Sequence, residues 1–163
     1  MEKKEIRVLL IDDEEELIDY LSKRLLRAGF TVTATTSGAQ ALEVATAEDF
    51  DVAIVDLKMP GIDGIETQRQ LKEIRPFLQT IVLTGHGSID TALESGKHDA
   101  FLFLAKPAEH EQLVQAIIDA KAHKKELLYD QFREEMEQIT SSGGSPKEIV
   151  HAVDQLRNKY GLR

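Results

Sequence analysis

The sequence predicts an α/β fold, in which helices doubly wind a five-stranded parallel sheet, followed by a C-terminal helical extension. Two observations lead to this prediction. Short apolar runs rich in Val, Ile and Leu alternate with longer stretches whose apolar residues recur at helical spacing. Most of the runs are continuous rather than alternating, which is typical of strands covered on both faces. Strands that alternate with helices form parallel sheets with right-handed crossovers.

Five apolar runs are the candidate strands, and each is too short for a helix. They cover residues 6–11, 31–35, 52–55, 80–84 and 100–105. The stretches between and after them are the candidate helices. Their apolar positions are Leu17, Ile18, Leu21, Leu25 and Leu26, then Ala41, Leu42 and Ala45, then Leu71 and Ile74, then Ile89, Ala92 and Leu93, and finally Leu113, Val114, Ile117 and Ala120.

Composition narrows the class of protein. A chain of 163 residues with 42% hydrophobic and 30% charged residues is typical of a soluble globular protein. The net charge of −9 argues against direct contact with nucleic acid, because Lys and Arg hold phosphate backbones. The absence of cysteine excludes disulfides and thiolate metal sites. We expect a cytoplasmic protein without a membrane span, since the N-terminal apolar stretch is too short for a signal peptide.

Polar residues end four of the five runs. Asp12 and Asp13 follow the first run, Asp56 the third and Lys106 the fifth, and Thr84 ends the fourth. In a parallel sheet these ends meet at one edge, where ligands bind. At about 4 Å and an effective dielectric near 20, each carboxylate pair repels by roughly 4 kcal/mol. We therefore expect a hard cation there, and Mg²⁺ suits carboxylates, waters and a phosphoryl oxygen.

Asp56 is the candidate nucleophile of this group. A carboxylate that attacks phosphorus forms an acyl phosphate, whose oxygens the cation and Lys106 would stabilise. Thr84 would donate a hydrogen bond. Each residue alone also has a structural explanation, such as an acidic helix start for "DDEEE". Their joint placement at the ends of four runs favours the functional interpretation.

Four motifs carry a family resemblance. They are "LLIDDEEEL" from residue 9, "VAIVDLKMPGIDG" from residue 52, "IVLTGHGS" from residue 81 and "FLFLAKP" from residue 101. In this order and spacing, the chain resembles the receiver domain of bacterial two-component response regulators, over roughly residues 5–122. "LTGHG" is similar to receivers of the nitrogen-regulatory type. The resemblance implies a flavodoxin-like fold.

The resemblance also implies roles for named residues. Asp56 would accept a phosphoryl group from a histidine kinase or histidine phosphotransferase. Asp13 and Asp56 would ligate Mg²⁺ directly and Asp12 through water. The backbone carbonyl of Lys58 would complete the protein ligands. Lys106 would pair with the phosphoryl oxygens, Thr84 would move toward them, and Phe103 occupies the place of the family's switch aromatic.

Two further expectations follow from the same resemblance. A cis peptide bond is expected between Lys106 and Pro107. Phe101 and Leu102 depart from the family pattern and make the fifth strand unusually apolar, so the output face is expected to differ in detail.

Residues 123–163 form a predicted helical tail beyond the receiver, which we assign to residues 1–122. Leu128, Phe132, Met136 and Ile139 lie on one helical face and predict that the fifth helix extends to about residue 139. "SSGGSP" predicts a break, with Pro146 in the first turn of a second helix. Its predicted apolar side holds Ile149, Val150, Val153, Leu156 and Tyr160.

Several functions stay open at this point. The leading hypothesis is a phosphorylation switch that acts through protein contacts, with the downstream partner unassigned. The alternatives are an Mg²⁺-dependent phosphohydrolase with Asp56 as nucleophile and a flavodoxin-like cofactor binder. Lys58 stands where such phosphatases carry a second Asp, and "DDEEE" would repel a phosphate. The tail either stabilises the protein by folding back or serves for homodimerisation or partner docking.

Overall fold

The computed structural model describes residues 5–57, 59, 61–85 and 100–162. The chain divides into two compact units, Met1–His123 and Lys124–Arg163. The first unit holds the sheet, and the second is a pair of helices. Among the residues that the structure describes, no helix combines the length and the apolar character needed to cross a bilayer.

The first unit is built on a parallel sheet of five strands in the order β2-β1-β3-β4-β5. The strands are β1 (Arg7–Ile11), β2 (Thr31–Thr35), β3 (Val52–Asp56), β4 (Gln79–Thr84) and β5 (Leu102–Ala105). The predicted fold class is confirmed. All five predicted strands are present, and β5 is shorter than predicted because pairing with β4 begins only at Leu102, opposite Ile81.

The helices of the first unit follow the strands as predicted. They are α1 (Glu15–Arg27), α2 (Gly38–Ala47), α3 (Gly64–Ile74) and the first part of α5 (His110–Ser141). The predicted helix around Ile89, Ala92 and Leu93 lies outside the described residues. Ser37 and Asp63 cap α2 and α3, since each side chain accepts a hydrogen bond from a backbone N–H in the first turn.

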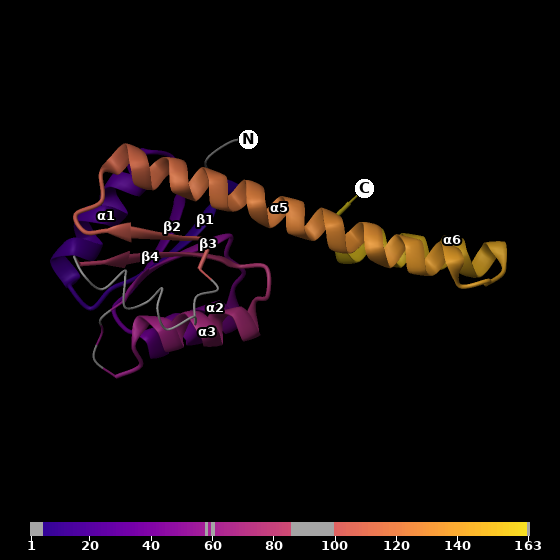
Figure 1. Cartoon of the computed structure of the whole chain (residues 1–163), viewed down its shortest axis with the longest axis horizontal. Coiled ribbons are helices and arrows are strands. Elements are labelled where there is room, and N and C mark those ends of the chain that lie inside the picture. Colours follow the sequence, from indigo (N-terminus) through magenta and orange to yellow (C-terminus); the bar gives the residue numbers. More distant parts are fainter. Residues whose placement is uncertain (1–4, 58, 60, 86–99, 163) are drawn as a thin grey trace. The chain divides into compact units, whose positions relative to one another are not determined.

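Helices cover both faces of the sheet (Figure 1), and a cluster of buried apolar residues lies on each side of it. On one side, Ile18 and Leu25 of α1 and Leu113 and Ile117 of α5 pack against the sheet. On the other side, α2 and α3 pack against it through small or branched residues, including Leu71. Because both faces are covered, the five residues of β3 are all buried.

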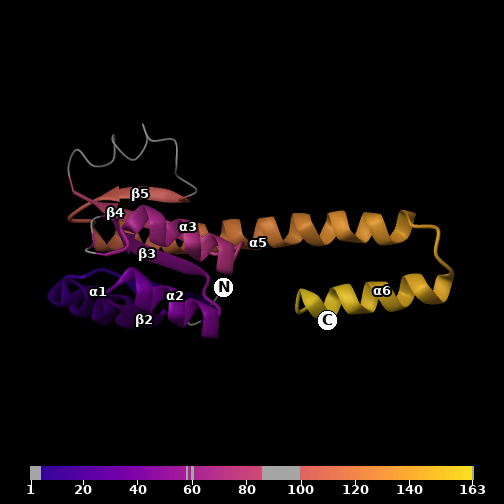
Figure 2. The same cartoon turned by 90° about the horizontal axis from the view of Figure 1, so that it is seen from below.

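The second unit is an antiparallel hairpin of the last part of α5 and of α6 (Pro146–Lys159) (Figure 2). α5 ends at Ser141 and α6 begins at Pro146, so residues 142–145 separate the two helices. The rings of Phe132 and Tyr160 meet edge to face, with centroids 5.7 Å apart. Lys159 Nζ lies 2.9 Å from a carboxylate oxygen of Glu135.

One predicted apolar position of the tail is wrong. Val150 is 61% exposed, whereas Leu156 is buried between the two helices. The residues that face α5 are spaced four, three and four positions apart, at Ile149, Val153, Leu156 and Tyr160. Val150 stands about 100° around the helix from Ile149 and falls outside this stripe.

Candidate functional site

The carboxyl ends of four strands meet at one edge of the sheet, as their polar residues predicted. Asp56 ends β3 opposite Leu83 of β4, and Thr84 ends β4 opposite Ala105 of β5. The next residue, Lys106, donates its backbone N–H to the carbonyl of Thr84 over 2.7 Å. The parallel register therefore brings residues that are far apart in the chain to one place.

Lys106 joins two of the three carboxylates. Its Nζ lies 3.0 Å from Oδ2 of Asp12 and 3.1 Å from Oδ1 of Asp56. Asp12 is held from its other oxygen, because Oδ1 accepts the backbone N–H of Glu14 over 2.9 Å. Asp12 and the ammonium of Lys106 are thus fixed before any ligand arrives.

The site buries most of its charge. Asp12 is 4% exposed, Asp56 is 7% exposed and Thr84 is 1% exposed, while Asp13 is exposed to solvent. Burial by itself lowers the pKa of Lys106, but the hydrogen bonds and charges of Asp12 and Asp56 outweigh it and raise the pKa above its ordinary value. Lys106 therefore stays protonated at neutral pH and offsets part of the negative charge.

The acidic residues are suited to a metal ion. Asp12, Asp13 and Asp56 each offer a carboxylate oxygen, and these oxygens lie within 4.8 Å of one another. Within the described residues they form the only group of three or more potential ligands of this kind. Three oxygen donors with one exposed member favour a hard divalent cation that keeps some of its water. The residues present thus fit a metal ion.

Two glycines that follow β3, Gly61 and Gly64, support the acceptor position. Gly61 has φ +80°, which favours glycine. Gly64 starts α3 against the strand end, and its N–H donates to the carbonyl of Leu57 over 3.1 Å. A Cβ built on Gly64 would lie 2.1 Å from the carbonyl oxygen of Asp56. Gly64 was not predicted as a site residue, although the Asp-Gly pair in "GIDG" was a signal for it.

The structure describes some of the remaining predicted site residues and not others. Lys58 lies outside the described residues. Phe103 is half-buried in β5, opposite Val82. Since Thr84 lies two residues after Val82, the side chains of Thr84 and Phe103 share one face of the sheet. The expected cis peptide bond between Lys106 and Pro107 is present and confirms that prediction.

Comparison with known proteins points to one family. The family model for the response regulator receiver domain matches residues 8–118. A similar relative is the transcriptional regulatory protein GlrR of Escherichia coli (strain K12), which is 35% identical over 134 residues, 82% of this chain and 30% of its own length. The DNA-binding transcriptional regulator NtrC of the same organism is 33% identical over 73% of this chain and 25% of its own length.

Solved structures agree with the sequence relatives. The crystal structure of a response regulator receiver domain protein from Clostridium thermocellum is 35% identical, with a TM-score of 0.70 over 75% of this chain and 98% of that chain. The chain spans only 30% or less of the length of the two curated relatives above. The matched segment, the order of the strands and the acidic group at their carboxyl ends agree: the chain belongs to the receiver domain family of two-component response regulators.

Proposed function

We propose that this protein is a signalling switch that accepts a phosphoryl group on Asp56 from a histidine kinase or a histidine phosphotransferase. The observation that carries the proposal is the position of Lys106 Nζ, 3.0 Å from Asp12 and 3.1 Å from Asp56. A buried carboxylate beside a fixed ammonium and two further acids is poor packing for stability alone. It is a suitable arrangement for chemistry at phosphorus.

The proposed reaction is a direct transfer between two nucleophiles. A carboxylate oxygen of Asp56 attacks the phosphorus of a phosphohistidine, so that an O–P bond forms while the N–P bond to the donor imidazole breaks. The leaving imidazole keeps the electron pair of that bond and takes a proton from solvent. Lys106 stabilises the charge on the phosphoryl oxygens in the transition state, because the reaction depends on positioning and electrostatics.

We propose that Mg²⁺ is the metal of this site. Asp13 and Asp56 would hold it directly, Asp12 through a water molecule, and the carbonyl of Lys58 would complete the protein ligands. The bound ion supplies positive charge to the phosphoryl oxygens. Within the chain, Asp12 also orients Lys106, which links the metal ligands to the ammonium group.

The proposed response to phosphorylation involves Thr84 and Phe103. Phosphorylation adds nearly two negative charges and three acceptor oxygens next to Thr84. The Thr84 hydroxyl would turn toward them, and Phe103, on the same face of the sheet, would fill the space that Thr84 leaves. The size of such a response is limited by the free energy with which the active packing binds the phosphoryl group.

The test is phosphorylation with acetyl phosphate and Mg²⁺, followed by intact mass. The whole chain is expected to gain one base-labile phosphoryl group, and Asp56→Asn is expected to gain none. Asp119→Asn, which removes an exposed carboxylate of α5, is the matched control and is expected to behave as the unmodified chain. Catalytic turnover of an added phosphomonoester without a labelled Asp56 would instead indicate a phosphohydrolase.

We also propose that residues 1–122 act as the receiver and residues 123–163 as a separate interaction element that joins two copies of the chain. The tail carries seven Lys and Arg and seven Asp and Glu, so the net charge of −9 belongs to the receiver. Output through protein contacts fits a tail that offers no basic stripe for nucleic acid. The downstream partner stays unassigned.

A further inference from the structure

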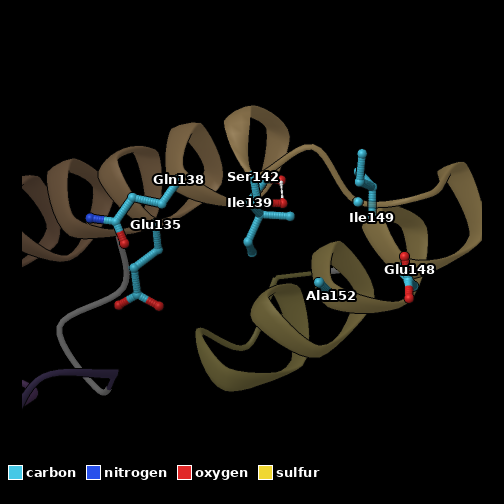
Figure 3. Close-up of a pocket in the computed structure, with 8 residues that line it drawn as sticks. Glu135, Gln138, Ile139, Ser142, Glu148, Ile149 and Ala152 are labelled. Atoms are coloured by element: carbon cyan, nitrogen blue, oxygen red, sulfur yellow. Dashed lines mark hydrogen bonds between the residues drawn. The ribbon is translucent and has the colours of Figure 1, made fainter.

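Two hollows of similar volume differ in the charges that line them. One lies on a flank of the tail hairpin and has a volume of about 530 Å³ (Figure 3). Both of its carboxylates already have partners, because Glu135 accepts hydrogen bonds from Lys159 and Tyr160 and Glu148 accepts the backbone N–H of Ser145. The charges of this groove are therefore satisfied within the hairpin.

The second hollow lies in the receiver, between α1 and the start of α5, and has a volume of about 460 Å³. It is lined by Tyr20, Lys23, Arg24, Arg27, Ala28 and His110. Three of these side chains are cationic, a fourth is a histidine, and none carries a carboxylate. In a chain with a net charge of −9, this hollow is a local reversal of sign.

Helical spacing explains why the cations of α1 gather. Lys23 and Arg24 follow Tyr20 by three and four positions, and Arg27 follows them by four and three, so all of them share one side of the helix. Arg24 and Arg27 also stand in the last turn of α1, where cations stabilise the negative end of the helix dipole. The dipole does not explain the histidine, which comes from α5.

Two guanidinium groups of the hollow have no opposite charge beside them. Lys23 Nζ lies 2.8 Å from a carboxylate oxygen of Asp19. Arg24 donates to the hydroxyl of Tyr20, and its Cζ lies 5.4 Å from the centroid of that ring, but contacts with a phenol leave its positive charge uncompensated. The exposed guanidinium of Arg27 makes no hydrogen bond or ion pair with any residue that the structure describes.

Acidic residues border the hollow and limit what can enter it. They are Glu16 and Asp19 on α1 and Glu109 and Glu111 on either side of His110, and all four are exposed. An acidic protein surface typically covers about 800 Å² of its partner, so it would meet these carboxylates as well as the cations. A compact anion inside the hollow would meet the cations alone. The charge pattern therefore favours a small ligand.

A polyphosphate has the chemistry that this lining recognises. Guanidinium groups bind phosphate oxygens through pairs of parallel hydrogen bonds. A polyphosphate carries several negative charges on adjacent groups, so that one small molecule can meet Lys23, Arg24 and Arg27 together. The volume of the hollow, about 460 Å³, lies within the range of about 300–1,000 Å³ that is typical of small-molecule sites.

We infer that the hollow between α1 and the start of α5 binds a compact polyphosphate anion through Lys23, Arg24 and Arg27. This inference goes beyond the proposed function, because the hollow shares no residue with the acceptor site. The two elements that form it nevertheless follow acceptor-site residues closely in the chain: α1 begins two residues after Asp13, and His110 follows Lys106 by four positions.

Isothermal titration calorimetry of the full chain with sodium tripolyphosphate tests the site. The buffer contains no Mg²⁺, because tripolyphosphate binds that ion itself. We expect one molecule to bind per chain, and about tenfold weaker binding for Arg24→Gln and for Arg27→Gln, since each loses charged hydrogen bonds. Arg133→Gln is the matched control: Arg133 also lies over a tyrosine four positions earlier, 5.8 Å from the Tyr129 centroid, but outside the hollow.

Three results would overturn the inference. They are no binding of tripolyphosphate to the unmodified chain, equal losses in Arg27→Gln and Arg133→Gln, and equally tight binding of a glutamate-rich peptide, which the bordering carboxylates should exclude. Far-UV circular dichroism checks that the variants keep their helices, since Arg and Gln have similar helix propensities. Phosphorylation of Asp56 is measured separately, so that failure of one proposal is distinguished from failure of the other.

Discussion

The receiver and the tail hairpin each contain an ion pair between a lysine and a carboxylate, and the two pairs differ in their exposure to solvent. In the receiver, Lys106 meets Asp56 with side chains that are 22% and 9% exposed. In the hairpin, Lys159 meets Glu135 with side chains that are 57% and 27% exposed. The distances between the charged groups are similar, at 3.1 and 2.9 Å. Solvent exposure, rather than geometry, separates the two sites.

This difference in exposure determines how strongly each ion pair contributes to the electrostatic energy of the protein. Water and ions screen the hairpin pair, so its contribution to stability is small. The receiver keeps its charges in a poorly solvated edge of the sheet, where attraction and repulsion are both stronger. Such an arrangement is retained for what it can bind, and the surrounding backbone must hold it in place. Four matched pairs of substitutions break or sharpen this comparison.

The largest expected effect comes from Gly64→Ala in the receiver. The added Cβ would lie 2.1 Å from the carbonyl oxygen of Asp56 and 2.7 Å from Cα of Leu57, both of which are backbone atoms. Relief requires a shift of β3 or α3, so we expect a loss of about 3 kcal/mol in the free energy of unfolding. Urea denaturation measures it.

Gly144→Ala in the hairpin loop is the matched control. Its added Cβ would meet its nearest neighbour, a carboxylate oxygen of Glu148, at 3.5 Å, an ordinary contact. We expect a change within about 0.5 kcal/mol. If the two variants have equal stability, the close approach between α3 and the end of β3 does not support the acceptor position.

Sequence and structure agree best where a pattern repeats. The strands were predictable because buried parallel strands are continuous apolar runs. The meeting of their polar ends was predictable because the carboxyl ends of parallel strands share one edge of the sheet. Gly64 was not predicted as a support, because a close approach between backbones depends on tertiary packing. Val150 was wrongly placed on the apolar side of its helix because it lies one residue beyond the stripe that contains Ile149.

The second largest expected effect is the loss of stability when a buried lysine, Lys121, is replaced, compared with the same replacement at the exposed Lys159. Lys121 of α5 meets Asp51 at 2.7 Å, with side chains that are 17% and 10% exposed. Asp51 also accepts the backbone N–H of Arg7 over 2.9 Å, at the end of the sheet opposite to the acceptor site. Lys121→Met removes the ammonium partner of this buried carboxylate, and we expect a loss of about 2 kcal/mol in the free energy of unfolding.

Lys159→Met makes the same change in the exposed pair with Glu135. We expect only a small change in the melting temperature. Salt at 0.5 M should largely remove this change, because the Debye length falls well below the value of about 10 Å that holds at about 0.1 M. The loss in Lys121→Met should persist at that salt concentration. Equal salt dependence of the two variants would contradict the role assigned to burial. The pair between Lys121 and Asp51 was not predicted, since the two residues lie 70 positions apart.

A smaller effect is expected at the start of α6. The side chain of Ser145 accepts the N–H of Glu148, and the carboxylate of Glu148 accepts the N–H of Ser145. Ser145→Ala removes half of this capping box, and we expect a loss of about 1 kcal/mol in hairpin stability. Ser145→Thr keeps the hydroxyl and serves as the control. Far-UV circular dichroism during urea denaturation follows the loss of helix.

The smallest expected effect is the change in the free energy of unfolding at alkaline pH that comes from Lys106 and Lys159. The hydrogen bonds and charges of Asp12 and Asp56 raise the pKa of Lys106 in spite of its burial, and a hydrogen bond to Glu135 raises the pKa of Lys159. A raised pKa means that the charged form stabilises the folded state. That contribution is complete below the unfolded pKa of about 10.4 and is lost as pH rises through the folded pKa.

Replacing each lysine by methionine isolates its share, because all other groups are common to the compared chains. Above about pH 10, the free energy of unfolding should fall less steeply in Lys106→Met than in the unmodified chain. Lys159→Met should show the same difference at low salt only, since its pair is exposed and screened. If 0.5 M salt, about three times the physiological ionic strength, also removes the difference for Lys106→Met, the acceptor site is as open to solvent as the hairpin, and burial does not set its electrostatics.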